Sequence, residues 1–479
     1  MPSSLKKKSV SAALWSIADI VFRKVLQFVL IIALMRMLTP EAFGTMALIY
    51  IFLEFSAVLV ESGFAAALIQ RQDVTHADES TVFWFNVFIG TCLALAFWIC
   101  SPLVAKVYGL PELEALTKIM GLTVFLNSLG TVHQTLLSKK LDFKPITLIG
   151  ILSSAISATV AIFLAWQGYG VWALAAQVIV SSLIINTIIW ILSDWRPLWV
   201  FKGDSIRKLF GFGSYIFLAG LVDLAYKGIF SFVIVKLFGV RDLGFFSRAE
   251  NLKQLPVDMI IITLTRVAFP AFSATAADPF KLRLGMQGAL RTVMFLNVPL
   301  MLGLIAAGEN FVLVVFGDKW LPAVPLLQIL ALAGLLWPLH ALNLNILKAR
   351  GESRLYFHLE ILKKLIGLAF IFIGARGGIE GLAWSQVAFT VVAFLINAHF
   401  TGKIINYGAL GQVIDVFPVI VVGLIMAAIA SSAGSLVSSD LIYVLSLQVL
   451  LGMLSYFFLC HFLKIKAYCD IRALLRGDR

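Results

Sequence analysis

The sequence predicts an all-α polytopic membrane protein with about fourteen transmembrane helices. Of its 479 residues, 60% are hydrophobic and only 13% are charged, and the mean hydropathy is +0.96. Apolar runs repeatedly reach the roughly 20 residues that an α-helix needs to cross a bilayer. These runs are continuous and do not alternate with polar residues, which excludes a membrane β-barrel.

Short connections that contain Pro, Gly or charged residues separate the apolar runs. The connection 193–210 is longer and contains Trp195 and Trp199, which favour the membrane interface. The connection 309–320 is apolar and is expected to lie on the membrane surface or to re-enter it. The expected spans are 11–37, 43–69, 80–104, 113–137, 145–166, 170–193, 211–237, 243–270, 286–307, 322–347, 355–374, 379–401, 413–433 and 439–463.

The first expected span, residues 11–37, is apolar but carries Asp19, Arg23 and Lys24 near its middle. Three central charges, at about +2.5 to +3.5 kcal/mol each, cancel most of the favourable free energy of inserting its apolar residues. Asp19 and Arg23 are four residues apart and can pair on one helix face, which Gln27 extends. The pair is therefore either a structural ion pair between helices or part of a polar pathway through a bundle.

Basic residues concentrate in alternate loops, so the net charge of +12 does not indicate nucleic-acid binding. One side receives Lys6 to Lys8, Lys139, Lys140 and the basic tail 464–479, whereas the other receives few basic residues. The positive-inside rule places the first side, with both termini, in the cytoplasm. The four cysteines form no close metal-binding motif and are interpreted as small packing residues.

A weak internal repeat divides the chain. Three pairs of segments match in the same order: 36–44 with 236–244, 137–144 with 347–354, and 170–175 with 378–383. The period contains six spans, an even number, so the two halves have the same orientation in the membrane and are parallel repeats. We predict a six-helix bundle at 1–200, a second six-helix bundle at 201–402, and two extra C-terminal helices with a basic tail at 403–479.

Charged residues within the expected spans concentrate on the first two helices of each repeat. Asp223 and Lys227 form a second acid–base pair at i, i+4, on the helix equivalent to residues 11–37. Facing lipid would cost such residues too much, so they face one another or water in a cleft, or else hold helices together. The basic candidates for substrate binding are Arg23, Lys24, Lys227, Arg248 and Lys253, and the acidic candidates for ion coupling or gating are Asp19, Asp223, Glu54, Glu61 and Asp258.

These residue types suit a transporter. Arg and Lys in a low-dielectric cleft attract an anionic substrate, and carboxylates beside them can bind and release a coupling ion. The sequence contains no HExxH motif, P-loop, nucleophile elbow or Cys/His metal spacing, and no expected loop is long enough for a catalytic domain. We therefore expect no catalytic residues, no metal site and no cofactor beyond a coupling H⁺ or Na⁺, and we expect no enzymatic activity.

Several segments resemble the polysaccharide-unit flippases of the Wzx type, in the multidrug/oligosaccharidyl-lipid/polysaccharide exporter superfamily. The resemblance extends over most of the chain up to the twelfth expected span, and it consists of apolar and turn patterns. Its clearest segments are Ser62 to Arg71 with Ser80 to Asn86, Leu137 to Phe143, Gly168 to Leu174, Phe238 to Pro256, and Phe316 to Trp320.

The resemblance implies two six-helix bundles with two extra C-terminal helices around a cationic cavity. It also implies that the protein moves an undecaprenyl-diphosphate-linked oligosaccharide across the bacterial cytoplasmic membrane by alternating access, for exopolysaccharide, O-antigen or capsule synthesis. The implied partners are this lipid-linked cargo, membrane lipids, and the polysaccharide polymerase and chain-length machinery. Two related alternatives remain open, a multidrug or cation antiporter and a peptidoglycan-precursor flippase, as well as a membrane-embedded polymerase or ligase.

Overall fold

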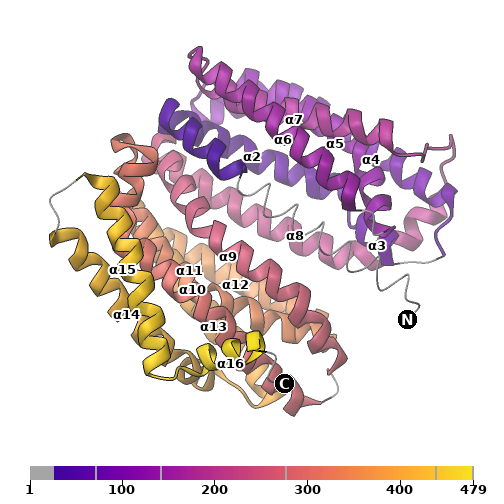
Figure 1. Ribbon diagram of the computed structural model, residues 1–479. Helices are drawn as coiled ribbons and strands as arrows, with labels where there is room; N and C mark the ends of the chain where they lie inside the picture. Colours follow the sequence, from indigo (N-terminus) through magenta and orange to yellow (C-terminus); the bar gives the residue numbers. More distant parts are fainter. Residues whose placement is uncertain (1–25, 71–72, 141–142, 276–277, 437–439, 477–479) are drawn as a thin grey trace. The chain divides into compact units, whose positions relative to one another are not determined.

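The computed structural model describes residues 26–70, 73–140, 143–275, 278–436 and 440–476, and every regular element in these ranges is helical (Figure 1). The chain enters this part through the helix Leu26–Met37. The elements that follow are α2 (Pro40–Glu61), α3 (Phe64–Gln70), α4 (His76–Tyr108), α5 (Glu112–Lys139), α6 (Phe143–Trp166), α7 (Val171–Leu192), α8 (Gly203–Phe238), α9 (Val240–Ala274), α10 (Pro279–Phe316), η1 (Asp318–Trp320), α11 (Ala323–Ala349), α12 (Ser353–Ala375), α13 (Gly378–Ile405), α14 (Ala409–Leu436), α15 (Leu441–Phe462) and α16 (Lys466–Arg476).

Ten helices of the described chain are long and apolar enough to cross a membrane, which confirms the predicted all-α polytopic class. The helices α8, α9 and α12 are 36, 35 and 23 residues long and are not among these ten. The first expected span lies partly outside the described residues, which begin at Leu26. The number of fourteen spans is therefore not confirmed.

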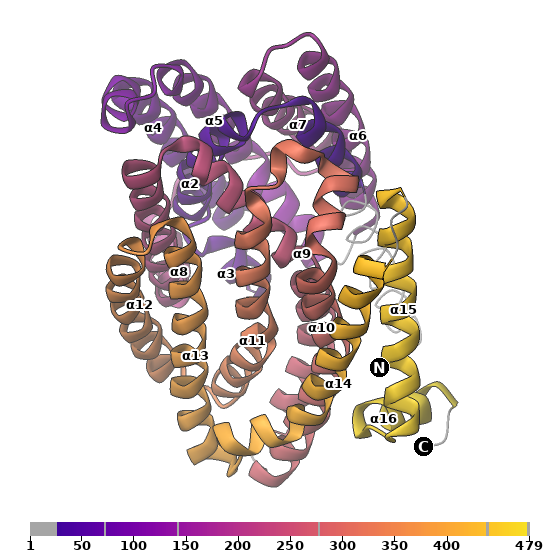
Figure 2. The same ribbon diagram turned by 90° about the vertical axis from the view of Figure 1, so that its left-hand side faces the viewer.

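The chain divides into two compact units, residues 1–244 and 245–479. In the first unit α4 packs along α5, α6 packs along α7, and α8 contacts α2, α3 and α4. In the second unit α10 contacts α11, α14 and α15, and α13 contacts α11 and α12. Figure 2 shows the short helix α16 lying across the end of α15, near the C-terminus. The division at residues 200 and 402, which follows the sequence repeat, stays a prediction.

The two helices beyond the repeat, α14 and α15, belong to the core of the second unit. One face of α10 presents a fully buried apolar row at every fourth position, and α14 packs valines against the same core. The Tyr456 hydroxyl on α15 donates to the Phe295 carbonyl on α10 at 2.8 Å. The buried residues of this core include Leu282, Met286, Leu290 and Met294 on α10 and Val416, Val419 and Val422 on α14.

Helix ends follow local sequence signals. Thr75 precedes α4 and forms a capping box with Asp78, so the first turn of that helix satisfies its own backbone N–H groups. Asp278 caps α10, its carboxylate accepting from the Phe280 and Lys281 N–H groups at 3.0 and 3.2 Å, and Pro279 occupies the first turn. The Lys281 N–H bond in particular lowers the pKa of the Asp278 carboxyl below its usual value.

The start of α9 crosses the start of α2 in very close contact. A Cβ atom on Gly44 would lie 1.9 Å from the Val240 carbonyl oxygen, and one on Gly244 would lie 2.0 Å from the Pro40 carbonyl oxygen. Only glycine allows the two backbones to approach so closely. Gly44 and Gly244 end the first matched pair of repeat segments, so the repeated sequence has a direct steric role at this crossing.

The segment 193–202, which joins α7 to α8, is bonded to the start of α4. The Trp195 indole N–H donates to the Glu79 carboxylate at 2.8 Å, and the Trp84 indole N–H donates to the Leu198 carbonyl at 2.8 Å. The Leu198 N–H in turn donates to the Ser80 hydroxyl at 3.0 Å. Trp195 was expected at the membrane interface; its indole N–H has a protein partner within the first unit.

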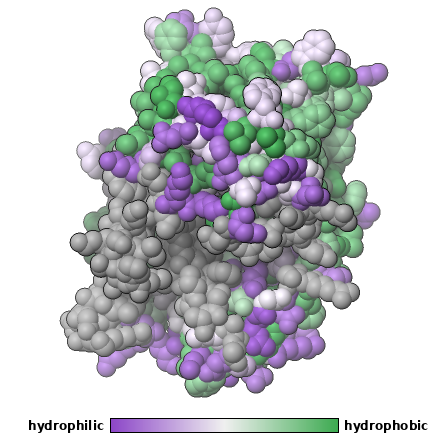
Figure 3. Space-filling view, turned by 90° about the vertical axis from the view of Figure 1, so that its right-hand side faces the viewer, coloured by the Kyte–Doolittle hydropathy of each residue, from purple (hydrophilic) through white to green (hydrophobic). Residues whose placement is uncertain are grey.

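In the upper part of Figure 3, hydrophilic side chains lie beside a broad hydrophobic area. A broad apolar surface next to polar side chains is typical of a protein that spans a membrane.

Candidate functional site

The ion pair predicted between Asp223 and Lys227 is present on α8. The Lys227 Nζ lies 3.3 Å from the Asp223 Oδ2, and the two side chains are 55% and 42% exposed within the described chain. Asp223 and Lys227 are the 21st and 25th residues of this 36-residue helix, well away from both of its ends. A half-exposed ion pair at this depth is too costly to face lipid, so it needs water, protein or an ionic ligand beside it.

The other candidates of the first unit fall into two groups. Glu54 and Glu61 lie on α2 with exposed side chains, and Glu61 is the last residue of that helix, where Ser62 adopts a left-handed conformation. Asp19, Arg23 and Lys24 lie outside the described residues, so their predicted roles stay predictions.

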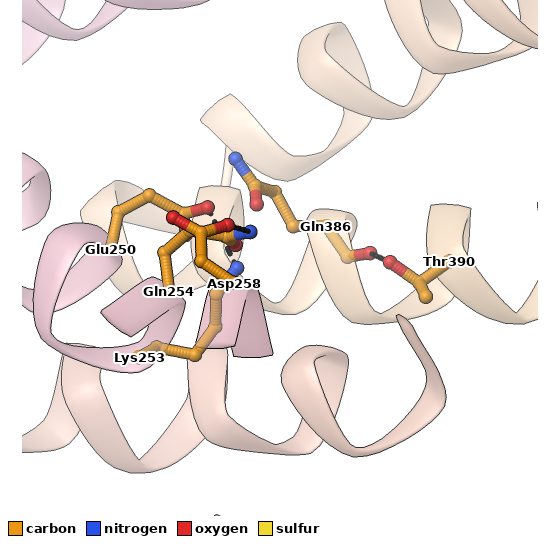
Figure 4. A network of polar contacts seen from close by, with 6 residues as sticks. All are labelled: Glu250, Lys253, Gln254, Asp258, Gln386 and Thr390. Carbon is orange, nitrogen blue, oxygen red and sulfur yellow. Dashed lines mark hydrogen bonds and ion pairs between the residues drawn. The ribbon is translucent and has the colours of Figure 1, made fainter. Parts of the chain in front are cut away.

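The second unit brings four polar side chains of α9 together (Figure 4). The Lys253 Nζ lies 2.7 Å from the Glu250 Oε1, and the Gln254 amide donates to the Asp258 Oδ1 at 2.8 Å. Figure 4 shows Gln386 of α13 pointing toward this group. The predicted candidates Lys253 and Asp258 therefore belong to one polar cluster, which we call the α9 cluster: Glu250, Lys253, Gln254 and Asp258.

The two basic candidates on α9 are buried. Arg248 is 9% exposed and Lys253 is 5% exposed. The Lys253 side chain passes over Gly334 of α11, where an added Cβ would lie 2.9 Å from the Lys253 Cγ. The second carboxylate oxygen of Glu250 is buried and has no hydrogen-bond partner among the described residues. This oxygen leaves the pair with Lys253 able to make a further polar or ionic contact.

A further buried pair was absent from the sequence-based candidates. Lys363 of α12 is 1% exposed, and its Nζ lies 2.5 Å from the Glu360 Oε1. The i, i+3 spacing of an acid and a base was the available signal, but sequence alone does not distinguish a buried pair from a pair at a helix end.

A polar cavity lies between the helix Leu26–Met37, α6 and α7. Its volume is about 180 Å³. Gln27, the described end of the polar face predicted on the first span, contributes to its wall. The remaining lining residues are Leu26, Leu30, Ser154, Ser157, Gln177, Val178, Ser181 and Ser182.

Comparison with known proteins identifies the family. Residues 33–325, more than half of the chain, match the family described as "Polysaccharide biosynthesis protein". The chain belongs to this family. The resemblance to Wzx-type flippases that the sequence suggested is thereby confirmed.

Two curated relatives and one solved structure are similar to this chain over most of its length. The chain is 29% identical to the teichuronic acid biosynthesis protein TuaB of Bacillus subtilis (strain 168), over 100% of both chains. It is 27% identical to the lipopolysaccharide biosynthesis protein WzxC of Escherichia coli (strain K12), over 82% of this chain and 81% of that one. Its fold is similar to the lipid II flippase MurJ in an inward closed conformation, with a TM-score of 0.78, 16% identity, and coverage of 96% and 99%.

These findings support a polysaccharide-related, multi-pass membrane flippase of the multidrug/oligosaccharidyl-lipid/polysaccharide exporter superfamily. At 16% identity, the similarity to MurJ concerns the fold alone.

Proposed function

We propose that the protein moves an undecaprenyl-diphosphate-linked oligosaccharide across the bacterial cytoplasmic membrane by alternating access, and acts as a transporter and not as an enzyme. The product would enter exopolysaccharide, O-antigen or capsule synthesis. The observation that carries the proposal is the placement of basic side chains within long helices: the Lys227 pair on α8, and the buried Arg248 and Lys253 on α9.

Basic side chains at these positions suit a diphosphate or an acidic sugar. A phosphate oxygen accepts charge-assisted hydrogen bonds, which are about twice as strong as neutral ones, and a water-poor environment strengthens them further. Arg248 can present a bidentate fork to phosphate, and Lys227 and Lys253 act as point charges. A drug or cation exporter would need an acidic site without this surplus of cations.

Acidic side chains beside the cations would couple transport to an ion. In the α9 cluster Glu250 is paired with Lys253, and Asp258 accepts from Gln254. Either carboxylate would exchange this partner for a coupling cation. When a phosphate binds Lys253, the Glu250 carboxylate loses its partner and becomes available to a coupling ion. Asp223 would respond to cargo at Lys227 in the same way.

The distribution of charge suggests the orientation of the protein in the membrane, and the proposed cargo suggests its partners. Basic loops on one side support a cytoplasmic location for both termini. The cargo must come from enzymes that assemble the oligosaccharide on its lipid, and the polymerase and chain-length machinery would receive it.

Complementation of a deletion strain tests the proposal. Lys227→Ala removes a half-exposed cation, so we expect normal expression and folding but at least about tenfold less exported polysaccharide, the effect of losing one charge-assisted contact. Lys118→Ala is the matched control, because Lys118 forms a similar i, i+4 pair with Glu114 at 2.7 Å on α5. Normal export by the Lys227 variant would contradict the proposed cationic contact.

The deletion strain also separates the alternatives. We expect it to accumulate lipid-linked oligosaccharide and to keep its resistance to cationic drugs. Drug sensitivity with normal polysaccharide would indicate an exporter of drugs, and loss of viability without polysaccharide defects would indicate a peptidoglycan-precursor flippase.

A further inference from the structure

The cavity between the helix Leu26–Met37, α6 and α7 has a neutral lining. Six of its lining residues are polar, namely two glutamines and four serines, and none is charged: Gln27, Gln177, Ser154, Ser157, Ser181 and Ser182. The chain from Pro145 to Ser193 contains no charged side chain, and it includes α6 beyond its first two residues and the whole of α7. An ionic ligand therefore finds no oppositely charged partner in this wall.

The depth of the cavity makes its polarity unusual. Ser154 lies near the middle of α6, and α6 and α7 are both long and apolar enough to span a membrane. Polar groups at such depth are rarely left without a function or a partner. Serines often serve close packing between membrane helices, and the hydrogen bond between Ser153 and Ser181 at 2.9 Å has that role here.

Packing does not account for the remaining polar groups. The side chains of Gln27, Gln177, Ser154 and Ser182 make no hydrogen bond to any residue that the structure describes. Two amides and two hydroxyls together present several donors and acceptors to one small space. A cavity of about 180 Å³ has room for about six waters, at roughly 30 Å³ each, or for the ring of one sugar unit.

The wall of the cavity also contains apolar side chains. Leu26, Leu30 and Val178 line the same cavity. A pyranose ring has hydroxyl groups around its rim and C–H groups on its faces, so it needs amide or hydroxyl partners together with apolar contact. A phosphate needs only the former, and a hydrocarbon chain needs only the latter.

We infer that this cavity is a subsite for one uncharged sugar of the lipid-linked oligosaccharide, held by Gln27, Gln177, Ser154 and Ser182. The inference rests on the proposed function, which supplies the oligosaccharide, and it assigns recognition of neutral sugar to the first unit. Basic residues elsewhere in the chain would bind the diphosphate and leave sugar selection to this cavity.

Binding of two lipids to the purified full-length protein tests the inference. The first is the lipid-linked oligosaccharide extracted from a strain that lacks this gene, and the second is undecaprenyl diphosphate without sugar; native mass spectrometry measures both affinities. We expect the wild type to bind the sugar-bearing lipid more tightly. Gln177→Leu combined with Ser182→Ala should weaken that binding about tenfold, as for two lost neutral hydrogen bonds, and leave undecaprenyl diphosphate binding unchanged.

Thr159→Ala is the matched control. Thr159 also lies on α6, but its exposed hydroxyl bonds only the Ala155 carbonyl of its own helix, at 3.0 Å, and does not line the cavity. Unchanged binding of undecaprenyl diphosphate by the double variant also demonstrates that it is folded.

The outcomes distinguish the inference from the proposed function. Equal wild-type affinity for the two lipids, or an unchanged sugar preference in the double variant, would overturn the subsite and leave the proposed function standing; the cavity would then hold water only. Failure of the wild type to bind either lipid would overturn the proposed function and the subsite with it.

Discussion

Glu41 and Arg241 form an ion pair in which the Glu41 Oε1 lies 3.2 Å from the Arg241 Nε. The two residues occupy equivalent positions of the first pair of repeat segments, each one three residues before the glycine at the α2–α9 crossing. A local motif at the start of α2 therefore meets its own repeat at the start of α9. The repeat thus has a structural meaning beyond common ancestry, because its two copies contact one another.

Charge reversal tests the ion pair. Glu41→Arg and Arg241→Glu should each destabilise the protein by less than about 1 kcal/mol, because both side chains are about half exposed and solvent screens them. The double reversal should recover most of the loss. A double-mutant cycle of thermal unfolding in detergent measures the coupling, and additive effects of the two changes would argue against a direct interaction.

Substitution of the crossing glycines should have a larger effect. Gly44→Ala and Gly244→Ala each place a Cβ about 2 Å from a backbone carbonyl oxygen, so the helices must separate. We expect a loss of about 1–3 kcal/mol in the free energy of unfolding. Gly303→Ala on α10 is the control, because its added Cβ meets no atom within 4 Å, and it should be neutral or slightly stabilising. Equal effects at the three positions would contradict the steric explanation.

Removal of one partner from the buried pair on α9 should be costly. Lys253→Met leaves the Glu250 carboxylate without its cation, and we expect a loss of up to about 3 kcal/mol, less than for a fully buried acid because Glu250 is 34% exposed. Lys253→Met combined with Glu250→Gln should recover most of this loss. Lys118→Met, which breaks a surface pair, should cost under about 1 kcal/mol. Chemical denaturation curves of the four proteins provide the comparison.

The N-cap of α10 predicts that the stability of the folded protein decreases at low pH. The pKa of the Asp278 carboxyl is lowered in the folded protein, chiefly by the Lys281 N–H bond, so the charged carboxylate stabilises the fold. This contribution is complete above the unfolded pKa, about 3.9, and is lost as the pH falls through the lower folded value. Thermal unfolding of wild type and Asp278→Ala should therefore differ at pH 6 and converge toward pH 3; a difference that persists at pH 3 would point to another cause.

The fold and part of the site followed from the sequence for a clear physical reason. Continuous apolar runs identify membrane helices because lipid excludes unpaired backbone groups, and the Asp223–Lys227 pair followed from helical spacing alone. The close contact of Gly44 with Val240 was signalled by the repeat, although its geometry was not.

Other features were hidden from the sequence because lipid and protein interior are equally apolar. In a membrane helix the apolar period does not reveal which face packs on protein. The burial of Lys363 and the cavity at Gln177 and Ser182 both depend on which faces meet, so only the packed helices of each unit reveal them. The charged residues of the first span stay predictions, since they lie outside the described residues.

The bonding of segment 193–202 to α4 has a practical consequence for following this protein at work. Trp195 and Leu198 of this segment are hydrogen-bonded to three residues at the start of α4, namely Glu79, Ser80 and Trp84. The segment should therefore move together with the start of α4 as one body. An antibody fragment that recognises both parts would therefore bind every transport intermediate with similar affinity. Such a binder would serve as a fixed fiducial for electron microscopy, against which displacement of the other helices could be measured.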